Sequence, residues 1–291
     1  MARIDIDGLE IDYELFGKPG DPAIVLTLGG RFPKDDPGLP EMARALAEGG
    51  KRVLLWDRPN CGASDLCFEG ESESELHGRT LARLIRALDL GPITFAGGSA
   101  GARISLVTAS RNPDRASHVV VWWISGGPIG CMGLAPIYCG EPAWLVSEGG
   151  MEAVADGACF KQQQDRNPRN RKILLAQDPE KFLETMQRWA KAYTYSEVSP
   201  VPSMSSQDWA RLNGLPTLVF RSGKSDLHHT RRTSEWVHEL LPSSRLVEPP
   251  WGDREWIDRV VAWRNGKGTL FQNWPKLAPA ILEFTARRAE L

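Results

Sequence analysis

A glycine-rich pentapeptide, Gly97-Gly98-Ser99-Ala100-Gly101, is the part of the sequence best suited to chemistry. It matches the pattern G-x-S-x-G, follows a short apolar run and precedes a stretch with helical character. This order places Ser99 on a sharp turn between a strand and a helix, where small neighbours leave the hydroxyl accessible. The helix behind it would direct its amino end, and the amide of Ala100, at negative charge developing on a substrate. We therefore expect Ser99 to be a nucleophile.

A serine hydroxyl is a weak nucleophile and needs a base, which histidine most often supplies. His228 and His229 follow a predicted strand at 217–220, and loops at the carboxyl ends of strands carry chemistry in open α/β sheets. Either imidazole could act on Ser99, or both could be surface or pocket-lining residues. We rank His229 slightly ahead because its extra residue lets the loop turn back.

The other three histidines are expected to have structural roles. His118 begins a predicted strand at the end of the sheet opposite Ser99, and His238 lies inside a predicted helix. His77 lies near the start of another helix, where a position on the helix surface is the preferred interpretation.

The elements that position these residues alternate between short apolar runs and helical stretches, which is typical of a mostly parallel sheet with crossover helices. An antiparallel pair is expected over 3–16, with a turn at Asp7-Gly8. The remaining predicted strands cover 23–28, 52–56, 93–96, 119–124, 217–220 and 245–248, and the predicted helices cover 40–48, 73–88, 100–110, 234–241 and 276–289.

The segment 128–212 contains helical pieces but no strong strand. A structureless loop of that length is improbable in a compact domain, so we interpret it as an inserted helical cap on a core formed by 1–127 and 213–291. The 11 tryptophans of the chain are concentrated in its middle and late parts. Aromatic residues here either line an apolar pocket or fill the core: Trp122, Trp123, Trp144, Trp189, Tyr193, Tyr195 and Trp209.

The chain resembles the α/β-hydrolase family, and the resemblance extends over nearly all of it. Leu28-Gly29-Gly30-Arg31 stands where that family has its oxyanion turn, which implies that the amide of Gly30 or Arg31 is the second oxyanion donor beside that of Ala100. Residues 57–64 are similar to the family's D-x-R-G-x-G-x-S loop, a structural turn. Cys61 lies in this loop, and without a nearby base it is expected to be an inert thiol.

The family order is serine, then acid, then histidine, and residues 221–226 resemble its acid turn. Asp226 is therefore the candidate acid, with capping of the next helix as the alternative. The position of the family's histidine, after the last strand, is occupied by Asp253. Asp226 or Asp253 would then orient a displaced loop histidine. Alternatively, Asp253 faces Ser99 beside Asp226, and the two carboxylates share a proton.

Composition excludes several other classes of function. Charged residues make up 25% of the 291 residues and the formal net charge is −2, so nothing favours binding to nucleic acid or to an anionic membrane. No apolar stretch is long enough for a membrane span. Five cysteines without C-x-x-C spacing indicate reduced thiols in the cytoplasm and neither a disulfide framework nor a metal site. No cofactor motif is present, and the oligomeric state stays open, a homodimer included.

The sequence thus predicts a hydrolase of small, partly aromatic ester, lactone or carbon–carbon bond substrates, with Ser99 as nucleophile and a displaced histidine base. Arg31, beside the oxyanion turn, could pair with a substrate carboxylate or an acidic loop residue, or face solvent. Two alternatives remain. One is a lyase or isomerase of the same fold that uses Asp226 and Asp253. The other is a ligand-binding protein that has lost its base.

Overall fold

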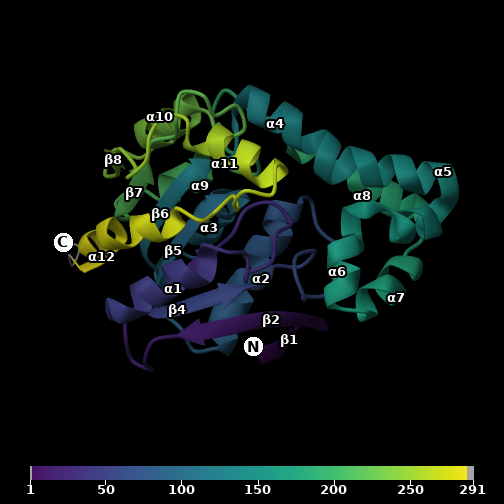
Figure 1. Cartoon of the computed structure of the whole chain (residues 1–291), viewed down its shortest axis with the longest axis horizontal. Helices are drawn as coiled ribbons and strands as arrows, with labels where there is room; N and C mark the ends of the chain where they lie inside the picture. The colour runs from purple at the N-terminus through teal and green to yellow at the C-terminus, as the bar shows by residue number, and fades with distance from the viewer. Residues whose placement is uncertain (1, 287–291) are drawn as a thin grey trace.

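An eight-stranded sheet forms the centre of the molecule, with helices on both of its faces (Figure 1). The computed structural model describes residues 2–286. The strand order is β1-β2-β4-β3-β5-β6-β7-β8; β1 and β2 run antiparallel to their neighbours, and the remaining pairs are parallel. The strands are β1 Ala2–Ile6, β2 Leu9–Phe16, β3 Ala23–Thr27, β4 Arg52–Trp56, β5 Ile93–Ser99, β6 Ala116–Ile124, β7 Thr217–Phe220 and β8 Arg245–Val247.

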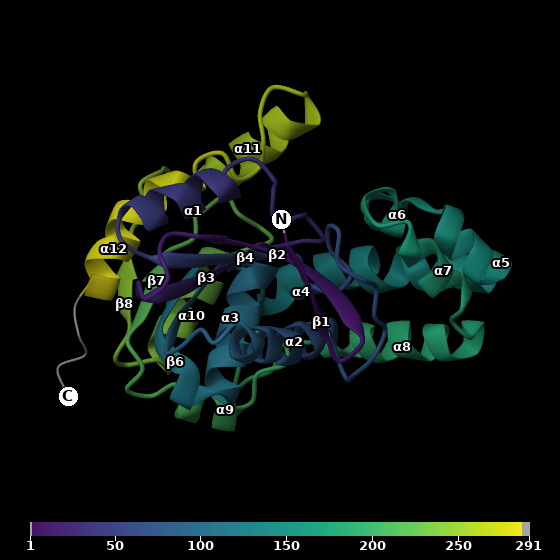
Figure 2. The ribbon, with the colours of Figure 1, turned by 90° about the horizontal axis from the view of Figure 1, so that it is seen from below.

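Two apolar clusters, one on each face of the sheet, make up most of the core. Helices α1 and α12 cover one face, and α2, α3, α9 and α10 cover the other (Figure 2). The helices are α1 Leu39–Glu48, α2 Glu73–Ala87, α3 Ala100–Arg111, α4 Gly127–Ala135, α5 Glu141–Asp156, α6 Lys161–Arg166, α7 Arg169–Leu175, α8 Pro179–Ala192, α9 Ser206–Arg211, α10 Arg231–Leu240, α11 Glu255–Arg264 and α12 Ala278–Ala286.

The predicted α/β class is confirmed, and the predicted strands and crossover helices lie close to their expected positions. Helix α10 begins three residues earlier than predicted because the Thr230 hydroxyl caps it, accepting a hydrogen bond from the amide of Thr233 at 3.2 Å. The closing helix is described to Ala286, and its predicted end at 289 lies outside the described residues. Helix α11 was not predicted.

A helical insert lies between β6 and β7 and has its own apolar cluster, separate from the two clusters on the sheet. Helices α4 to α8 extend to one side of the core, as Figures 1 and 2 both show. Helix α9 instead contributes Trp209 to the core cluster that contains α3. The bounds of the cap at 128–212 remain a prediction.

Candidate active site

Ser99 lies at the junction of the central strand β5 and helix α3. Its backbone dihedral angles are φ 59° and ψ −123°, a conformation that L-residues rarely adopt. Such strain amounts to about 1–3 kcal/mol and is typical of functional turns. The turn lifts the hydroxyl out of the sheet at the amino end of α3, where the first amides have no partner within the helix.

Two glycines allow this turn to pack against the neighbouring strand. A Cβ atom on Gly101 would lie 1.9 Å from the carbonyl oxygen of Thr27, at the end of β3. A Cβ atom on Gly29 would lie 2.3 Å from the Cβ of Ser99 itself. Side chains at these two positions are therefore excluded, and the oxyanion turn predicted at 28–31 lies directly against Ser99.

Asp226 and His229 lie together in the loop that follows β7, and this loop reaches Ser99. The Nε2 atom of His229 is 2.8 Å from the Ser99 hydroxyl oxygen, and its Nδ1 atom is 2.9 Å from a carboxylate oxygen of Asp226. Both loop side chains are buried. Of the two histidines that the sequence offered, the structure brings His229 to Ser99.

The hydrogen bonds of Asp226 determine the tautomer of His229. Its Oδ1 atom accepts the backbone amides of His228 and His229 at 3.0 and 2.8 Å, which leaves Oδ2 for the imidazole. A carboxylate only accepts, so the Nδ1 atom of His229 carries the proton. The lone pair of Nε2 then faces the Ser99 hydroxyl, which is the arrangement that a general base requires.

Two tryptophans enclose the imidazole of His229. The ring of Trp123, at the end of β6, is nearly parallel to it at 14° with the centroids 5.9 Å apart, and Trp256 of α11 presents its edge at 4.7 Å. Trp123 has an unusual φ of 44°, so the end of β6 is strained at this contact. The packing fixes the plane of the base and shields its hydrogen bonds from water.

Comparisons with known proteins show the fold in which these residues lie. Residues 36–122, which include Ser99, match the family model described as alpha/beta hydrolase fold. A solved hydrolase from Pseudomonas aeruginosa superimposes with a TM-score of 0.62 at 19% identity, covering 98% of both chains. The chain has the α/β-hydrolase fold. An enol-lactonase from Burkholderia xenovorans gives a TM-score of 0.61 at 19% identity, over 98% of this chain and all of that one.

A sequence relative covers a smaller part of the chain. The 2-hydroxy-6-oxononadienedioate/2-hydroxy-6-oxononatrienedioate hydrolase of Cupriavidus pinatubonensis is 36% identical over 92 residues, or 32% of this chain. The match spans only 31% of the length of that relative.

The turn at 28–31, which is predicted to bind an oxyanion, is held by the buried side chain of Arg58. Its Nη2 atom donates to the carbonyl oxygens of Gly29 and Gly30 at 3.3 and 2.6 Å. The N–H and C=O groups of a trans peptide point in opposite directions. The amides of Gly30 and Arg31 therefore point away from Arg58, so neither is occupied by the contact that holds the turn.

Asp253 is not in the position that one alternative required. That alternative has Asp253 facing Ser99; instead its carboxylate forms ion pairs with Arg231 and Lys224, and its side chain is 43% exposed. The loop after β8 thus places it at the protein surface.

His228 is also directed away from Ser99, because its Nδ1 atom accepts a hydrogen bond from the indole N–H of Trp256 at 3.2 Å. Burial, followed by the proximity of His229, lowers the pKa of His228.

His77 differs from its expected position on a helix surface. It is only 3% exposed, and its Nε2 atom lies 2.8 Å from the carbonyl oxygen of Pro59. Burial lowers its pKa to about 3, so it is neutral at physiological pH. The other two histidines have the structural contacts expected of them: His118 packs edge-on against Phe284, and His238 bonds the Ser244 hydroxyl at 2.7 Å.

Arg31 is largely buried beneath the insert. Its Nε atom donates to Glu73 at 3.3 Å and its Nη2 atom to the carbonyl oxygen of Tyr138 at 3.0 Å. The guanidinium lies over the rings of Tyr138 and Phe160, with centroid distances of 5.3 and 4.6 Å. Burial opposes the charges of this pair, but their attraction outweighs it: the pKa of Arg31 is raised and that of Glu73 lowered. Of the alternatives considered from the sequence, an acidic partner is observed, but Glu73 belongs to helix α2 and not to a loop.

The aromatic residues that were expected either to line a pocket or to fill the core have different locations. Trp189 and Trp209 are buried in apolar clusters, and Trp144 and Tyr195 are exposed. Sequence reasoning missed Trp256 because α11 was not predicted. It gave no individual role to Arg58, although this residue lies in the predicted structural turn 57–64, and it missed Tyr138, which carried no pattern.

The thiol of Cys61 agrees with its expected inertness, since burial raises its pKa to about 12. Within residues 2–286, no group of three or more histidine, cysteine or acidic side chains is arranged to hold a metal ion. In the same range no helix is both long and apolar enough to cross a membrane.

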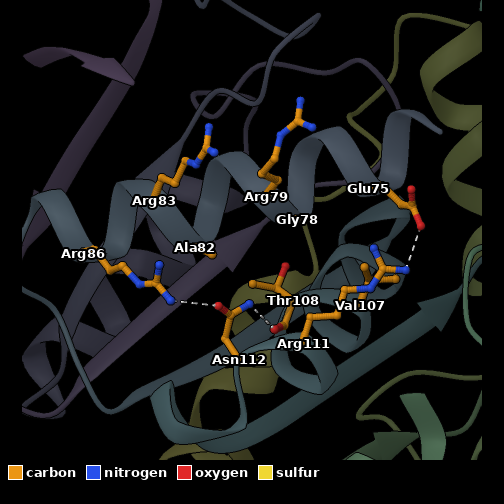
Figure 3. Close-up of a pocket in the computed structure, with 10 residues that line it drawn as sticks. All are labelled: Glu75, Gly78, Arg79, Ala82, Arg83, Arg86, Val107, Thr108, Arg111 and Asn112. Atoms are coloured by element: carbon orange, nitrogen blue, oxygen red, sulfur yellow. Dashed lines mark hydrogen bonds and ion pairs between the residues drawn. The ribbon is translucent and has the colours of Figure 1, made fainter. Parts of the chain in front are cut away.

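A groove of about 260 Å³ between α2 and α3 lies apart from Ser99 (Figure 3). Its lining comes from nearly the whole length of α2, Glu75 to Arg86, and from the carboxyl-terminal end of α3. Arginine side chains from both helices surround it, and Arg111 pairs with Glu75 across it at 2.7 Å. The groove is therefore a surface feature, separate from the candidate active site.

Proposed function

We propose that the protein is a serine hydrolase of small ester, lactone or carbon–carbon bond substrates. The observation that carries the proposal is the pair of hydrogen bonds from Ser99 to His229 and from His229 to Asp226, at 2.8 and 2.9 Å. Serine, base and orienting acid in this arrangement constitute the recurring constellation of acyl-transfer enzymes. The similarity to an enol-lactonase and to a carbon–carbon bond hydrolase supports the choice of bonds.

In the proposed mechanism, the Nε2 atom of His229 removes the hydroxyl proton as Ser99 attacks the substrate carbonyl. Asp226 holds the imidazole in the required tautomer and stabilises its protonated form. The amides of Ala100 and of Gly30 or Arg31 bind the oxyanion, and each such donor is typically worth about 3 kcal/mol in the transition state. The protonated His229 then donates to the leaving group, and water releases the acyl group from Ser99 by the reverse sequence.

The first test is the rate at which a fluorophosphonate labels Ser99, because only an activated serine reacts quickly. We expect the wild-type protein to label and Ser99→Ala to remain unlabelled. His229→Ala should label at least 1,000-fold more slowly, by analogy with the loss of a triad base.

His228→Ala, in the same loop as His229, and Asp253→Asn, in the loop after β8, serve as controls, and both should label at nearly the wild-type rate. A wild-type protein that does not label would overturn the hydrolase proposal. Rapid labelling of His229→Ala together with loss in either control would show that a different residue is the base.

A further inference from the structure

Arg103 lies one helical turn after Ser99 on α3 and is only 2% exposed. Its Nε and Nη1 atoms are both buried without a hydrogen-bond partner. Among the described residues, no carboxylate forms an ion pair with it. Its guanidinium lies over the ring of Tyr193, with the carbon atom 5.2 Å from the ring centroid. A buried guanidinium without an anion is energetically unfavourable, so the arrangement needs an explanation.

The position of Arg103 relates it to the candidate active site. Ser99 directly precedes α3 and Arg103 is the fourth residue of this helix, so about 6 Å of helix rise separates their Cα atoms. Tyr193 stacks on Tyr138 at 6.1 Å and 15°. The Tyr138 hydroxyl lies 3.4 Å from where a Cβ atom of Gly30 would be. A continuous row of side chains thus joins Arg103 to the oxyanion turn, between the insert and the core.

The charges in this region do not balance. Three buried guanidiniums, those of Arg31, Arg58 and Arg103, lie around the oxyanion turn and α3. Glu73 neutralises the charge of Arg31, and the carbonyl oxygens of the turn accept the hydrogen bonds that Arg58 donates. The carboxylate of Asp226 is engaged with His229 and two backbone amides. Arg103 therefore retains a positive charge that no described acidic residue neutralises.

We infer that Arg103 is a specificity-determining residue that binds a carboxylate on the acyl part of the substrate. A planar guanidinium donates two parallel hydrogen bonds to a carboxylate through Nη2 together with either Nε or Nη1, and both of these last two atoms of Arg103 are unpartnered. The short distance along α3 favours a substrate whose carboxylate is only a few bonds from the carbonyl that Ser99 attacks. This inference rests on the proposed hydrolase function and adds the charge of the substrate to it.

The test compares two esters of matched length, mono-p-nitrophenyl glutarate and p-nitrophenyl valerate, which differ in the terminal carboxylate. We expect the wild-type kcat/KM to favour the glutarate ester by at least tenfold. Arg103→Met should lose about 10- to 100-fold on the glutarate ester, the range for a charged hydrogen-bonding partner, and change less than threefold on the valerate ester. Arg103→Lys keeps the charge and should keep part of the preference.

The matched control is Arg111→Met, which removes the same charge from the exposed end of the same helix and should leave both esters unchanged. Parallel loss on both esters in Arg103→Met would show that Arg103 only supports Tyr193, and would overturn the inference. Equal activity of the wild-type protein on the two esters would also overturn it. If Arg103→Met does not fold, the wild-type preference and its reduction in Arg103→Lys decide the question.

Binding measurements separate this inference from the proposed function. Free glutarate should raise the melting temperature of the wild-type protein, whereas neutral valeramide should not, and Arg103→Lys should reduce the effect. These outcomes do not require Ser99 to be reactive. Stabilisation by glutarate without fluorophosphonate labelling would leave the anion site standing and overturn the hydrolase proposal. Labelling without any glutarate effect or ester preference would support the hydrolase proposal and overturn the anion site at Arg103.

Discussion

Replacing Asp226 by asparagine tests the proposed triad most sharply, because the substitution preserves shape and changes only the donors and acceptors. The Oδ1 atom of Asp226 accepts two backbone amides, so this position continues to require an acceptor. The amide oxygen of the asparagine therefore occupies the position of Oδ1, and the amide NH2 group faces the Nδ1 atom of His229. A donor there forces the imidazole into the tautomer with its proton on Nε2.

That tautomer directs an N–H group at the Ser99 hydroxyl, which then has no base. In a triad of this kind the loss in kcat is about 10⁴-fold. At about 1.36 kcal/mol for each factor of ten, it corresponds to about 5.4 kcal/mol of transition-state stabilisation.

The assay is kcat/KM for a p-nitrophenyl ester at neutral pH, with the melting temperature measured in parallel to show that the variant folds. Asp253→Asn is the matched control: it removes a carboxylate from the loop after β8, whose partners are the surface cations Arg231 and Lys224. It should retain most of the activity. A folded Asp226→Asn variant within tenfold of wild type would refute the reasoning, as would an equal loss in Asp253→Asn.

Three further predictions concern packing and charge. Gly29→Ala should reduce activity more than 100-fold, because its Cβ atom would overlap the nucleophile at 2.3 Å, whereas Gly252→Ala, with nothing within 4 Å, should be neutral in the same ester assay. His77 has a folded-state pKa of about 3 and an unfolded value near 6.5, so the unfolded chain gains its proton first as the pH falls. This lowers the free energy of unfolding by about 3 kcal/mol between pH 7 and pH 4, and in denaturant titrations His77→Gln should lack that part of the decrease. Glu73→Gln should destabilise the fold by about 3–5 kcal/mol, since it leaves Arg31 buried without its carboxylate, and a double change with Arg31→Met should restore part of the loss.

Each of these expectations can fail on its own. Full activity of Gly29→Ala would show that the turn moves away from the nucleophile at little cost. A wild-type pH dependence in His77→Gln would assign the acid sensitivity to other groups. Additive effects of the Glu73 and Arg31 changes would show that the two side chains are not coupled.

The parts of the fold that could be predicted from the sequence are those with a local cause. The strands 52–56 and 217–220 are short apolar runs bounded by polar residues, and both were predicted with the bounds that the structure has. The turn at Ser99 was predictable because the pattern G-x-S-x-G and its position between a strand and a helix are local, although Gly101 makes room for the distant carbonyl of Thr27. The burial of His77 depends on its contact with a distant backbone carbonyl, which has no sequence signal.

In the candidate site, too, the features with a local cause could be predicted and those that depend on distant contacts could not. Asp226 and His229 are three residues apart, so their pairing was within reach of sequence reasoning, although His228 remained almost as good a candidate. Asp253 was considered because it occupies the place of the family's histidine; its actual partners come from another loop and the start of α10. Arg103 lay outside every recognised pattern, because its significance depends on the partners that it lacks.

The short separation between Asp226 and His229 has a consequence for how this loop can change. Closing a contact over three residues removes little chain entropy, in the way that a single turn of helix does. The acid that orients the imidazole is therefore positioned by how one strand, β7, ends. In the proposed mechanism the segment after β8 moves no proton; it contributes packing, through Trp256 against the imidazole and Asp253 against Ser225. The acid and the base thus belong to one contiguous segment, 221–230, whereas the plane of the imidazole depends on residues outside it.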